Sequence, residues 1–368
     1  MELKNRFLFT VAVVAAIVVS ASCAKEITEN SDDAEKRIVA AFLKIDQNNT
    51  WTIVNKDSVA VLMTGSGTGR GATDTSYVFV NVSVFDIKGN YLTGYVYGTS
   101  TGGDGMSTNN EALAKRLGEY RQTYYYGSRL LSLNETMMSV SRGLRAAIVG
   151  KKVGDSFKVL VPSWASDYGQ YSTARQSTFP VIYDIEILQI IEDYDEYVLD
   201  QLQQYSDSHY AGMGPIKVKD ENDNETEVEG VYMAVIANGT GDVLGDGERI
   251  NFNYTASLLN GFVFTTSIED VAREHRIYSS DKTYGTILDY TISDPDNASS
   301  SEDNTSVTLP IGIRKALTLV KAGDTVVIFV SHSQGTQGAD SYNTSSPQYG
   351  WWQPLLYRIV IEPASADD

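Results

Sequence analysis

The sequence predicts an α+β protein with two tandem domains, each a curved, mostly antiparallel sheet wrapped on a short helix. The first observation is an internal repeat, because Gly67-Thr68-Gly69 recurs as Gly239-Thr240-Gly241, 172 positions later. The second is hydrophobic alternation, the period of a half-buried strand, which runs through most of both copies. The third is a helix-length segment that follows Gly143 and, 169 positions later, Gly312.

The N-terminus predicts a secreted lipoprotein. Lys4 and Arg6 precede an apolar run that ends in Ser20-Ala21-Ser22, directly before Cys23. This junction resembles a bacterial lipobox, so we expect residues 1–22 to be a signal peptide and Cys23 to be acylated after cleavage at its amino side. A short transmembrane anchor is the alternative, because the apolar run is barely long enough to span a bilayer.

Residues 23–34 carry charge, Ser and Asn but little apolar surface, which predicts a flexible tether behind the lipidated cysteine. We expect a protein of the bacterial cell envelope, lipid-anchored to a membrane, with the outer membrane favoured and the domains facing the periplasm or the cell surface. The net charge of −18 disfavours nucleic acid as a partner. Because Cys23 is the only cysteine, no thiol remains for catalysis, a disulfide or a zinc site.

Apolar residues at helical spacing predict a helix at the start of each copy, over Glu35–Asn48 and Tyr194–His209. From Asp207 to Glu229 the chain is rich in Gly, Lys, Asp, Asn and Glu, which predicts a solvated connection. We therefore expect a first domain over 35–193, a helix and linker over 194–228, and a second domain over 229–364.

The two copies predict the same strands. Phe157–Val161 and Val326–Val330 alternate so that every second residue lies on one apolar face. The last strands, Val181–Ile187 and Leu355–Ile361, repeat this pattern. Matching strands at matching offsets indicate one domain that occurs twice.

Two glycine-rich motifs fit enzyme fingerprints but lie in the wrong context. Gly67–Ala72 fits the dinucleotide fingerprint, yet a strand follows where a phosphate site needs the N-terminus of a helix. Gly98–Gly102 fits the nucleophile elbow of serine hydrolases, yet glycines follow where a helix must begin. His209, His275 and His332 are the only histidines, and none has a recognisable partner. We therefore do not expect a hydrolase.

Metal and cofactor sites are not predicted. Asp220–Asn224 resembles a calcium loop but lacks its central glycine and final glutamate. The chain has 47 Asp and Glu residues, so paired carboxylates are weak evidence for a metal site or for acid–base catalysis. We expect the segment to be solvated charge.

Aromatic residues are the remaining candidates for a site. The chain has 23 Tyr, 11 Phe and 4 Trp, and Tyr254, Phe264 and Tyr357 fall on predicted strands around one short helix. A concave sheet on a helix leaves room for an apolar pocket between such side chains. Ordinary core packing is the alternative for each of them.

The sequence resembles the FK506-binding-protein (FKBP) family of peptidyl-prolyl isomerases. In the second copy, Asn253–Phe264 is similar to the family's strand, turn and strand, and Leu309–Asp324 is similar to its helix. The closing strand and the matching segments of the first copy are Pro354–Tyr357, Val140–Asp155, Val161–Gly169 and Pro180–Ile187. The resemblance extends from about Trp51 to Glu362.

The resemblance implies two pockets. The second copy would use Tyr254, Phe264, Leu309, Pro310, Ile313 and Tyr357. A secondary pocket in the first copy would use Tyr168, Tyr183 and Leu144. Both depart from the family pattern. In the second copy Thr265 stands at the position of the pocket aspartate and Ile313 at that of the tryptophan floor, and in the first copy Leu144 stands at that of the tryptophan.

The implied function is prolyl isomerisation, or chaperone-like binding, of exported polypeptides. Rotation of an X-Pro amide faces a barrier of about 18–20 kcal/mol and needs no nucleophile and no cofactor. The expected partners are proline-containing polypeptides or envelope proteins. The alternative is a catalytically inactive lipoprotein of the same fold that binds peptides or serves as a scaffold. An insertion in the first copy, Gly98–Leu130 with a helix-like Asn109–Tyr120, favours this alternative because it lies where a peptide would approach.

Overall fold

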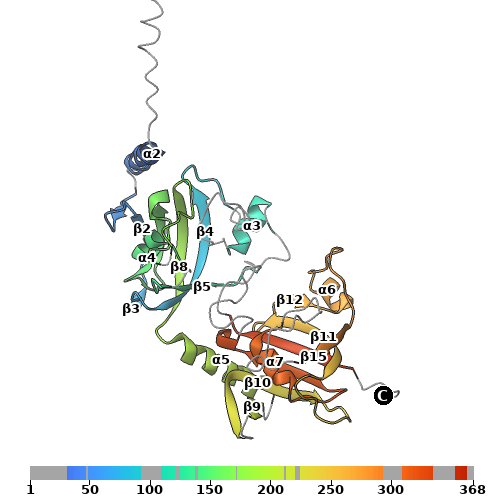
Figure 1. Cartoon of the computed structure of the whole chain (residues 1–368). Coiled ribbons are helices and arrows are strands. Elements are labelled where there is room, and N and C mark those ends of the chain that lie inside the picture. Colours follow the sequence, from blue (N-terminus) through green and yellow to red (C-terminus); the bar gives the residue numbers. More distant parts are fainter. Residues whose placement is uncertain are drawn as a thin grey trace, which may run out of the picture. The chain divides into compact units, whose positions relative to one another are not determined.

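We analysed a computed structural model of the chain (Figure 1). The structure describes residues 31–46, 49–92, 109–118, 120, 125–136, 140–170, 172–210, 213–219, 224–292, 309–334 and 353–362. These residues belong to two compact units, one that ends at Asn49 and one that begins at Thr50. The predicted signal peptide, Cys23 and the motif at Gly98–Gly102 lie outside the described residues.

The first unit contributes one helix, α2 (Ser31–Ile45). It begins four residues before the predicted start, so the prediction of a tether is wrong for residues 31–34. Asp32 and Asp33 lie in the first turn and Lys44 in the last, where each charge is favoured by the helix dipole. Among the described residues, no helix combines the length and the hydropathy needed to cross a membrane.

The second unit opens with a six-stranded sheet in which all neighbours are antiparallel, in the order β1-β2-β7-β8-β4-β5. Its strands are β1 (Thr52–Ile53), β2 (Ala60–Gly65), β4 (Tyr77–Asp86), β5 (Arg129–Ser132), β7 (Ser156–Val161) and β8 (Val181–Ile191). A small ribbon and three short helices complete the first repeat: β3 (Thr68–Gly71), β6 (Lys152–Val153), α3 (Glu111–Leu117), α4 (Arg142–Ile148) and η2 (Ser163–Ala165).

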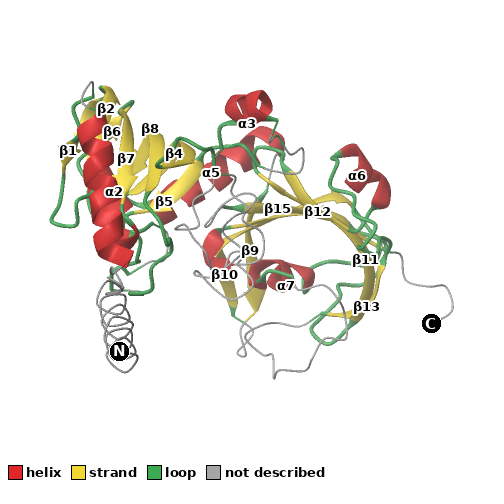
Figure 2. Ribbon diagram, turned by 90° about the horizontal axis from the view of Figure 1, so that it is seen from above, coloured by secondary structure: helices red, strands yellow, loops and turns green. Residues whose placement is uncertain are grey.

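The second repeat follows α5 (Tyr194–His209) and has the strand order β12-β11-β15-β14-β10-β9, with β13 also paired to β11. Its strands are β9 (Gly214–Lys219), β10 (Glu225–Ala237), β11 (Arg249–Leu258), β12 (Val263–Thr266), β13 (Ile287–Thr291), β14 (Thr325–Val330) and β15 (Leu355–Ile361). Its helices are α6 (Glu269–Glu274), α7 (Ile311–Leu317) and η3 (His332–Gln334). Figure 2 shows α7 inside the curve of this sheet.

The two sheets share one register as well as one strand order. Ile185 lies opposite both Val82 and Phe157 in the first sheet, and Ile359 lies opposite both Tyr254 and Val326 in the second. The matching positions differ by 172 for the strand that carries Val82 and by 169 for the strand that carries Phe157, as the sequence repeat predicts. The α+β class and the repeated, antiparallel, helix-filled sheet are therefore confirmed.

Each repeat also has a buried aspartate at the equivalent position, Asp155 in the first and Asp324 in the second. The Asp155 carboxylate accepts hydrogen bonds from the backbone N–H groups of Gly67 and Lys152, at 2.6 and 2.7 Å. Asp324 accepts from the N–H groups of Gly239 and Lys321 at the same two distances. Both glycines belong to the repeated Gly-Thr-Gly triplet. The triplet therefore recurs because its first glycine donates the same backbone hydrogen bond to an aspartate in each repeat.

We expect Asp155→Asn to lower the free energy of unfolding by about 1–3 kcal/mol, because one buried N–H loses its acceptor. Burial by itself raises the pKa of Asp155, but the hydrogen bonds from Gly67 and Lys152 lower it, and the net pKa is below the usual value. The stabilisation is therefore present above the unfolded pKa, about 3.9, and is lost as the pH falls through the folded pKa. Urea unfolding of wild type and Asp155→Asn at pH 7 and at about pH 2.5 measures the free energy of unfolding that depends on this carboxylate.

The control for that experiment is Asp242→Asn, since Asp242 is exposed. The difference between wild type and Asp155→Asn should shrink at the lower pH, while Asp242→Asn should match wild type at both. An equal loss of stability at both pH values would contradict the assignment of the effect to the carboxylate.

Helix α5 has the predicted bounds, and the segment after it does not have the predicted structure. Asp193 caps α5, because its carboxylate accepts from the N–H of Glu196 at 3.0 Å. The expected solvated connection is instead the hairpin of β9 and β10. Ile216 and Val228 are buried in the second core, so the hairpin is held by apolar side chains among the charged ones. Residues 220–223, in the expected charged segment, lie outside the described part.

Candidate functional site

Two tyrosines from adjacent strands form the wall of the candidate site in the second repeat. Tyr254 on β11 and Tyr357 on β15 have ring centroids 6.2 Å apart with planes 23° from parallel. Both are buried, with exposed fractions of 7% and 6%. Alternation along β11 and β15 directs both rings toward the concave side that α7 fills.

Helix α7 supplies the apolar floor and lip. Leu309 and Ile313 belong to the same buried cluster as the two tyrosines, and Ile313 is fully buried. Pro310 is the residue before α7, where its fixed φ starts the helix. Phe264 on β12 is half-buried and packs against this cluster. The structure thus gathers five of the six predicted residues, Tyr254, Phe264, Leu309, Ile313 and Tyr357, and places Pro310 beside them.

A polar pair lies beside this wall. Lys282 Nζ donates to Thr265 Oγ1 at 2.8 Å. Burial raises the pKa of Tyr254, and the neighbouring Thr265 side chain opposes this rise. Burial lowers the pKa of Lys282. The Tyr254 hydroxyl therefore stays protonated and can donate to a carbonyl.

Lys282 was not predicted from the sequence. It lies 17 positions from Thr265 in the irregular segment after α6, and its side chain reaches back to β12. No periodic pattern marks such a residue. The only signal is a lysine in a segment that also supplies Tyr278 and Tyr284, whose rings stack with centroids 5.3 Å apart.

Tyr125 is a second residue that the sequence did not point to. Its hydroxyl accepts from Asn260 Nδ2 at 2.9 Å, and its ring lies 5.0 Å from that of Phe262. Asn260 and Phe262 form the turn between β11 and β12, and Tyr125 belongs to the same buried cluster as Tyr254. Tyr125 lies within the predicted insertion of the first repeat, so this insertion contributes an aromatic ring to the second core. The insertion's predicted helix is confirmed as α3, although residues 98–108 lie outside the described part.

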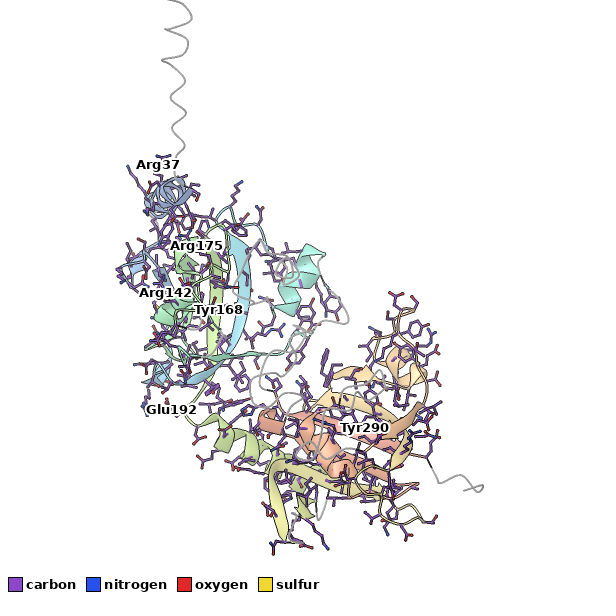
Figure 3. All side chains as sticks on the ribbon, viewed as in Figure 1. Arg37, Arg142, Tyr168, Arg175, Glu192 and Tyr290 are labelled. Atoms are coloured by element: carbon purple, nitrogen blue, oxygen red, sulfur yellow. The ribbon has the colours of Figure 1, made fainter. Side chains whose placement is uncertain are left out.

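The three residues of the predicted secondary pocket do not all lie in one cluster. Leu144 and Tyr183 are almost fully buried in the first core, whereas Tyr168 is half-buried and lies outside that cluster. Arg142, the first residue of α4, lies near Tyr168 in Figure 3. It donates two hydrogen bonds to Asp167, at 3.2 and 2.9 Å. The second repeat has the apolar Ile311 at the position of Arg142.

Two histidines have partners that were not recognised in the sequence. His332 is buried, and its Nε2 lies 3.3 Å from Oδ1 of Asp195 on α5. Its ring also lies 5.2 Å from that of Tyr194. His209 Nδ1 lies 2.8 Å from Ser208 Oγ, and its ring stacks on Tyr205. The prediction that no histidine has a partner is therefore wrong for His209 and His332. Asp195 was missed because it is 137 positions from His332. The contact joins α5 to the end of β14.

Within the described part of the chain, no group of three or more His, Cys, Asp or Glu side chains is arranged to hold a metal ion. The candidate site is instead apolar and aromatic, with the hydroxyls of Tyr254 and Tyr357 and one neighbouring ammonium group, that of Lys282. Such a site can desolvate and orient a peptide group, and it has no arrangement for nucleophilic attack.

No protein-family model matches the sequence, and no curated protein matches it. Among solved structures, the chain is similar to the three FKBP domains of wheat FKBP73, with 10% identity over 85% of this chain and 98% of that one and a TM-score of 0.26. It is similar to FkpA from Escherichia coli, with 16% identity over 50% and 71% of the two chains and a TM-score of 0.29. A peptidyl-prolyl cis-trans isomerase from Pseudomonas syringae pv. tomato has 16% identity over 45% and 92%, with a TM-score of 0.26.

The wheat protein is named as an FKBP and the Pseudomonas protein as a peptidyl-prolyl isomerase. Scores this low add no argument about the chain, so the fold rests on the strand order, the common register and the enclosed helix of each repeat. On those grounds the chain holds two copies of one α+β fold, each an antiparallel sheet around a short helix.

Proposed function

We propose that the second repeat is a peptidyl-prolyl cis-trans isomerase, or a chaperone of that type, which acts on exported polypeptides. The observation that carries this proposal is the stacked pair of Tyr254 and Tyr357 in the same buried cluster as Ile313. This is an apolar surface that also carries tyrosine hydroxyls as hydrogen-bond donors.

The proposed mechanism uses desolvation and one hydrogen bond. The planar X-Pro amide is stabilised by resonance, and the twisted amide loses that resonance and the charge separation that goes with it. An apolar wall of Tyr357, Phe264 and Ile313 therefore disfavours the planar amide more than the twisted one. The hydroxyl of Tyr254 would orient the substrate carbonyl. No bond to the protein is formed.

The second candidate is a catalytically inactive peptide-binding or scaffold domain. Three observations favour it. Thr265 leaves the pocket without the carboxylate of the family pattern, and Ile313 gives a smaller floor than a tryptophan. In addition, Tyr125 covers the turn at Asn260 and Phe262, next to the wall. A domain with these changes would keep an apolar surface for a peptide while losing rate acceleration.

Exchange spectroscopy on a proline tetrapeptide distinguishes the two candidates. The mature chain should make cis-trans exchange faster than the uncatalysed exchange, which takes about tens to hundreds of seconds. Binding of the peptide without acceleration would support the inactive binding module. If the chain neither binds the peptide nor accelerates its exchange, both candidates are contradicted.

We propose that the mature protein is anchored in the bacterial cell envelope by a lipid on Cys23, with the outer membrane as its site and proline-containing or envelope polypeptides as its partners. The support is the sequence alone, because the apolar run and the single cysteine are typical of a lipobox. One acyl chain gives only marginal membrane binding, so more than one chain is required for stable anchoring.

Cys23→Ala should abolish incorporation of labelled fatty acid and move the protein from the membrane fraction to the soluble fraction. Metabolic labelling followed by fractionation measures both effects. Ser22→Ala is the matched control, since it keeps a small residue before the cysteine and should be labelled as wild type. Acyl labelling that persists in Cys23→Ala would contradict the assignment.

A further inference from the structure

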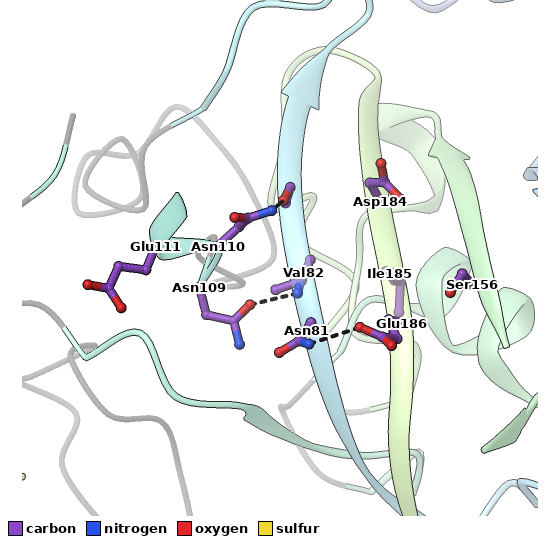
Figure 4. A pocket seen from close by; sticks show the side chains of 10 residues that line it. Asn81, Val82, Asn109, Asn110, Glu111, Ser156, Asp184, Ile185 and Glu186 are labelled. Carbon is purple, nitrogen blue, oxygen red and sulfur yellow. Dashed lines mark hydrogen bonds between the residues drawn. The ribbon is translucent and has the colours of Figure 1, made fainter. Parts of the chain in front are cut away.

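A polar cavity of about 450 Å³ lies on the first sheet, on the opposite face from its core (Figure 4). Val82 and Ile185 direct their side chains into the core, so their neighbours Ser83, Asp184 and Glu186 direct theirs to the other face. The start of α3 forms the opposite wall. This cavity is separate from the aromatic site of the second repeat and from the secondary pocket around Tyr183.

The wall opposite the sheet is fixed by a buried amide. Strand β5 pairs with β4 only as far as Val80, and the Asn109 side chain continues the pairing beyond that point. Its Oδ1 accepts from the N–H of Val82 at 2.7 Å, and its Nδ2 donates to the carbonyls of Val80 and Gly127 at 3.2 and 2.8 Å. Asn110 also donates to Ser83 Oγ, at 3.2 Å. The cavity is therefore held open in the folded chain.

The described lining consists of amides, hydroxyls and carboxylates. Glu186 accepts one hydrogen bond from Asn81, at 3.0 Å, through Oε2. Asp184 has Lys158 as a cationic neighbour, with Nζ 3.9 Å from Oδ2, longer than a hydrogen bond. Burial raises the pKa of Asp184, and Lys158 opposes this rise. Carboxylate and amide oxygens therefore face the cavity, and the Asp184 side chain among them is still 41% exposed to water.

The charge and shape of this lining select the ligand. Three of the lining side chains are carboxylates, and two of them have a lysine neighbour, Lys115 beside Glu111 and Lys158 beside Asp184. The site keeps a net negative charge, which disfavours an anion. An apolar group would lose contacts, because the described lining side chains that face the cavity are polar. A compact cation with several N–H donors would satisfy the carboxylates and the amide oxygens together.

We propose that this cavity binds a primary ammonium or guanidinium group, carried by a lysine or arginine side chain of a polypeptide or by a free polyamine. Asp184 and Glu186 would accept from the cation, and Asn81 and Ser83 would bind the neighbouring polar atoms. The inference does not depend on isomerase activity. If the source is a polypeptide, the first repeat provides a basic-residue anchor of its own.

Calorimetric titration of the mature chain tests this with three probes: spermidine, a short Gly-Lys-Gly-Arg peptide, and the same peptide with an acetylated lysine and a citrulline in place of the arginine. We expect the unmodified peptide, spermidine or both to bind, and the uncharged peptide to bind at least ten-fold more weakly. Binding of the peptide alone identifies a polypeptide source, and binding of spermidine alone identifies a free polyamine.

The matched variants locate the binding. Asp184→Asn with Glu186→Gln should weaken binding at least ten-fold. Glu225→Gln with Glu227→Gln, an exposed pair with the same spacing on β10, should leave it unchanged. Lys158→Gln should tighten binding, because it removes the internal cation, and this change on a half-exposed side chain keeps the fold.

Equal binding by the two double variants would overturn the proposal, and so would binding of the uncharged peptide as tightly as the charged one. Binding of a neutral oligosaccharide in place of all cationic probes would also overturn it and assign the cavity to sugars. If the Asp184 and Glu186 double variant fails to fold, unchanged affinity in Lys158→Gln is the result that contradicts the site.

Discussion

Phe264→Ala should remove most of the prolyl isomerase activity of the mature chain, and Tyr254→Phe should reduce it to a smaller extent. Phe264 forms part of the apolar wall, so its truncation admits water to the position where the amide twists. Tyr254→Phe keeps the ring that stacks on Tyr357 and removes only the hydroxyl that donates to the carbonyl. Exchange rates of a proline tetrapeptide measure both effects.

These variants require a test of folding, because truncation of a buried Phe costs about 3–5 kcal/mol. Phe264 is only half-buried, so we expect a smaller cost and a folded variant. Phe85→Ala is the matched control, since Phe85 is a half-buried aromatic residue of the first repeat that packs against Tyr91. Its activity should equal that of wild type.

The comparison of Phe264→Ala with Phe85→Ala also assigns the activity to a repeat. Loss of activity in Phe85→Ala alone would place it in the first repeat and contradict the proposal. If all variants bind the peptide and none, including wild type, accelerates exchange, the second repeat is a binding module.

Local periodicity was enough to predict the strands and the repeat. Phe157 and Val326 occupy equivalent positions because every second residue of each strand faces a core, and that rule leaves a direct trace in the sequence. Helix α5 was predicted to the residue, since its apolar stripe begins after a capping Asp193. The part of the β9–β10 hairpin before Gly230 was missed because its few apolar residues, such as Ile216 and Val228, stand among charged ones.

The contacts that complete the candidate site could not be predicted in this way. Lys282 contacts Thr265 from an irregular segment, and Tyr125 contacts Asn260 across 135 positions. Neither contact follows from the periodicity of a helix or strand, because each depends on the position of a loop in the tertiary structure. The resemblance gave the positions of the pocket walls, but the residue that supports Thr265 lies outside any motif.

Gly312→Val should lower the stability of the second repeat by about 1–3 kcal/mol or more, because the helix has no room for a side chain there. A Cβ at Gly312 would lie 2.7 Å from Val231 Cγ2 and 2.8 Å from Val330 Cγ1. Both valines are fully buried on β10 and β14, so neither can move aside. Valine has a better helix propensity than glycine, but the gain is below about 1 kcal/mol and offsets only part of the clash.

Gly245→Val is the matched control, since nothing lies within 4 Å of a Cβ at Gly245 and its φ is not in the left-handed region. Urea unfolding should show a lower midpoint for Gly312→Val and a much smaller change for Gly245→Val. Gly143→Val should behave like Gly312→Val, because its Cβ would lie 2.8 Å from Val161 Cγ1. Equal midpoints for Gly312→Val and Gly245→Val would show that α7 can withdraw from the sheet. Since α7 carries Ile313 and follows Leu309, such a withdrawal would also leave the floor of the candidate pocket adjustable, and Phe264→Ala would then cost less activity than expected.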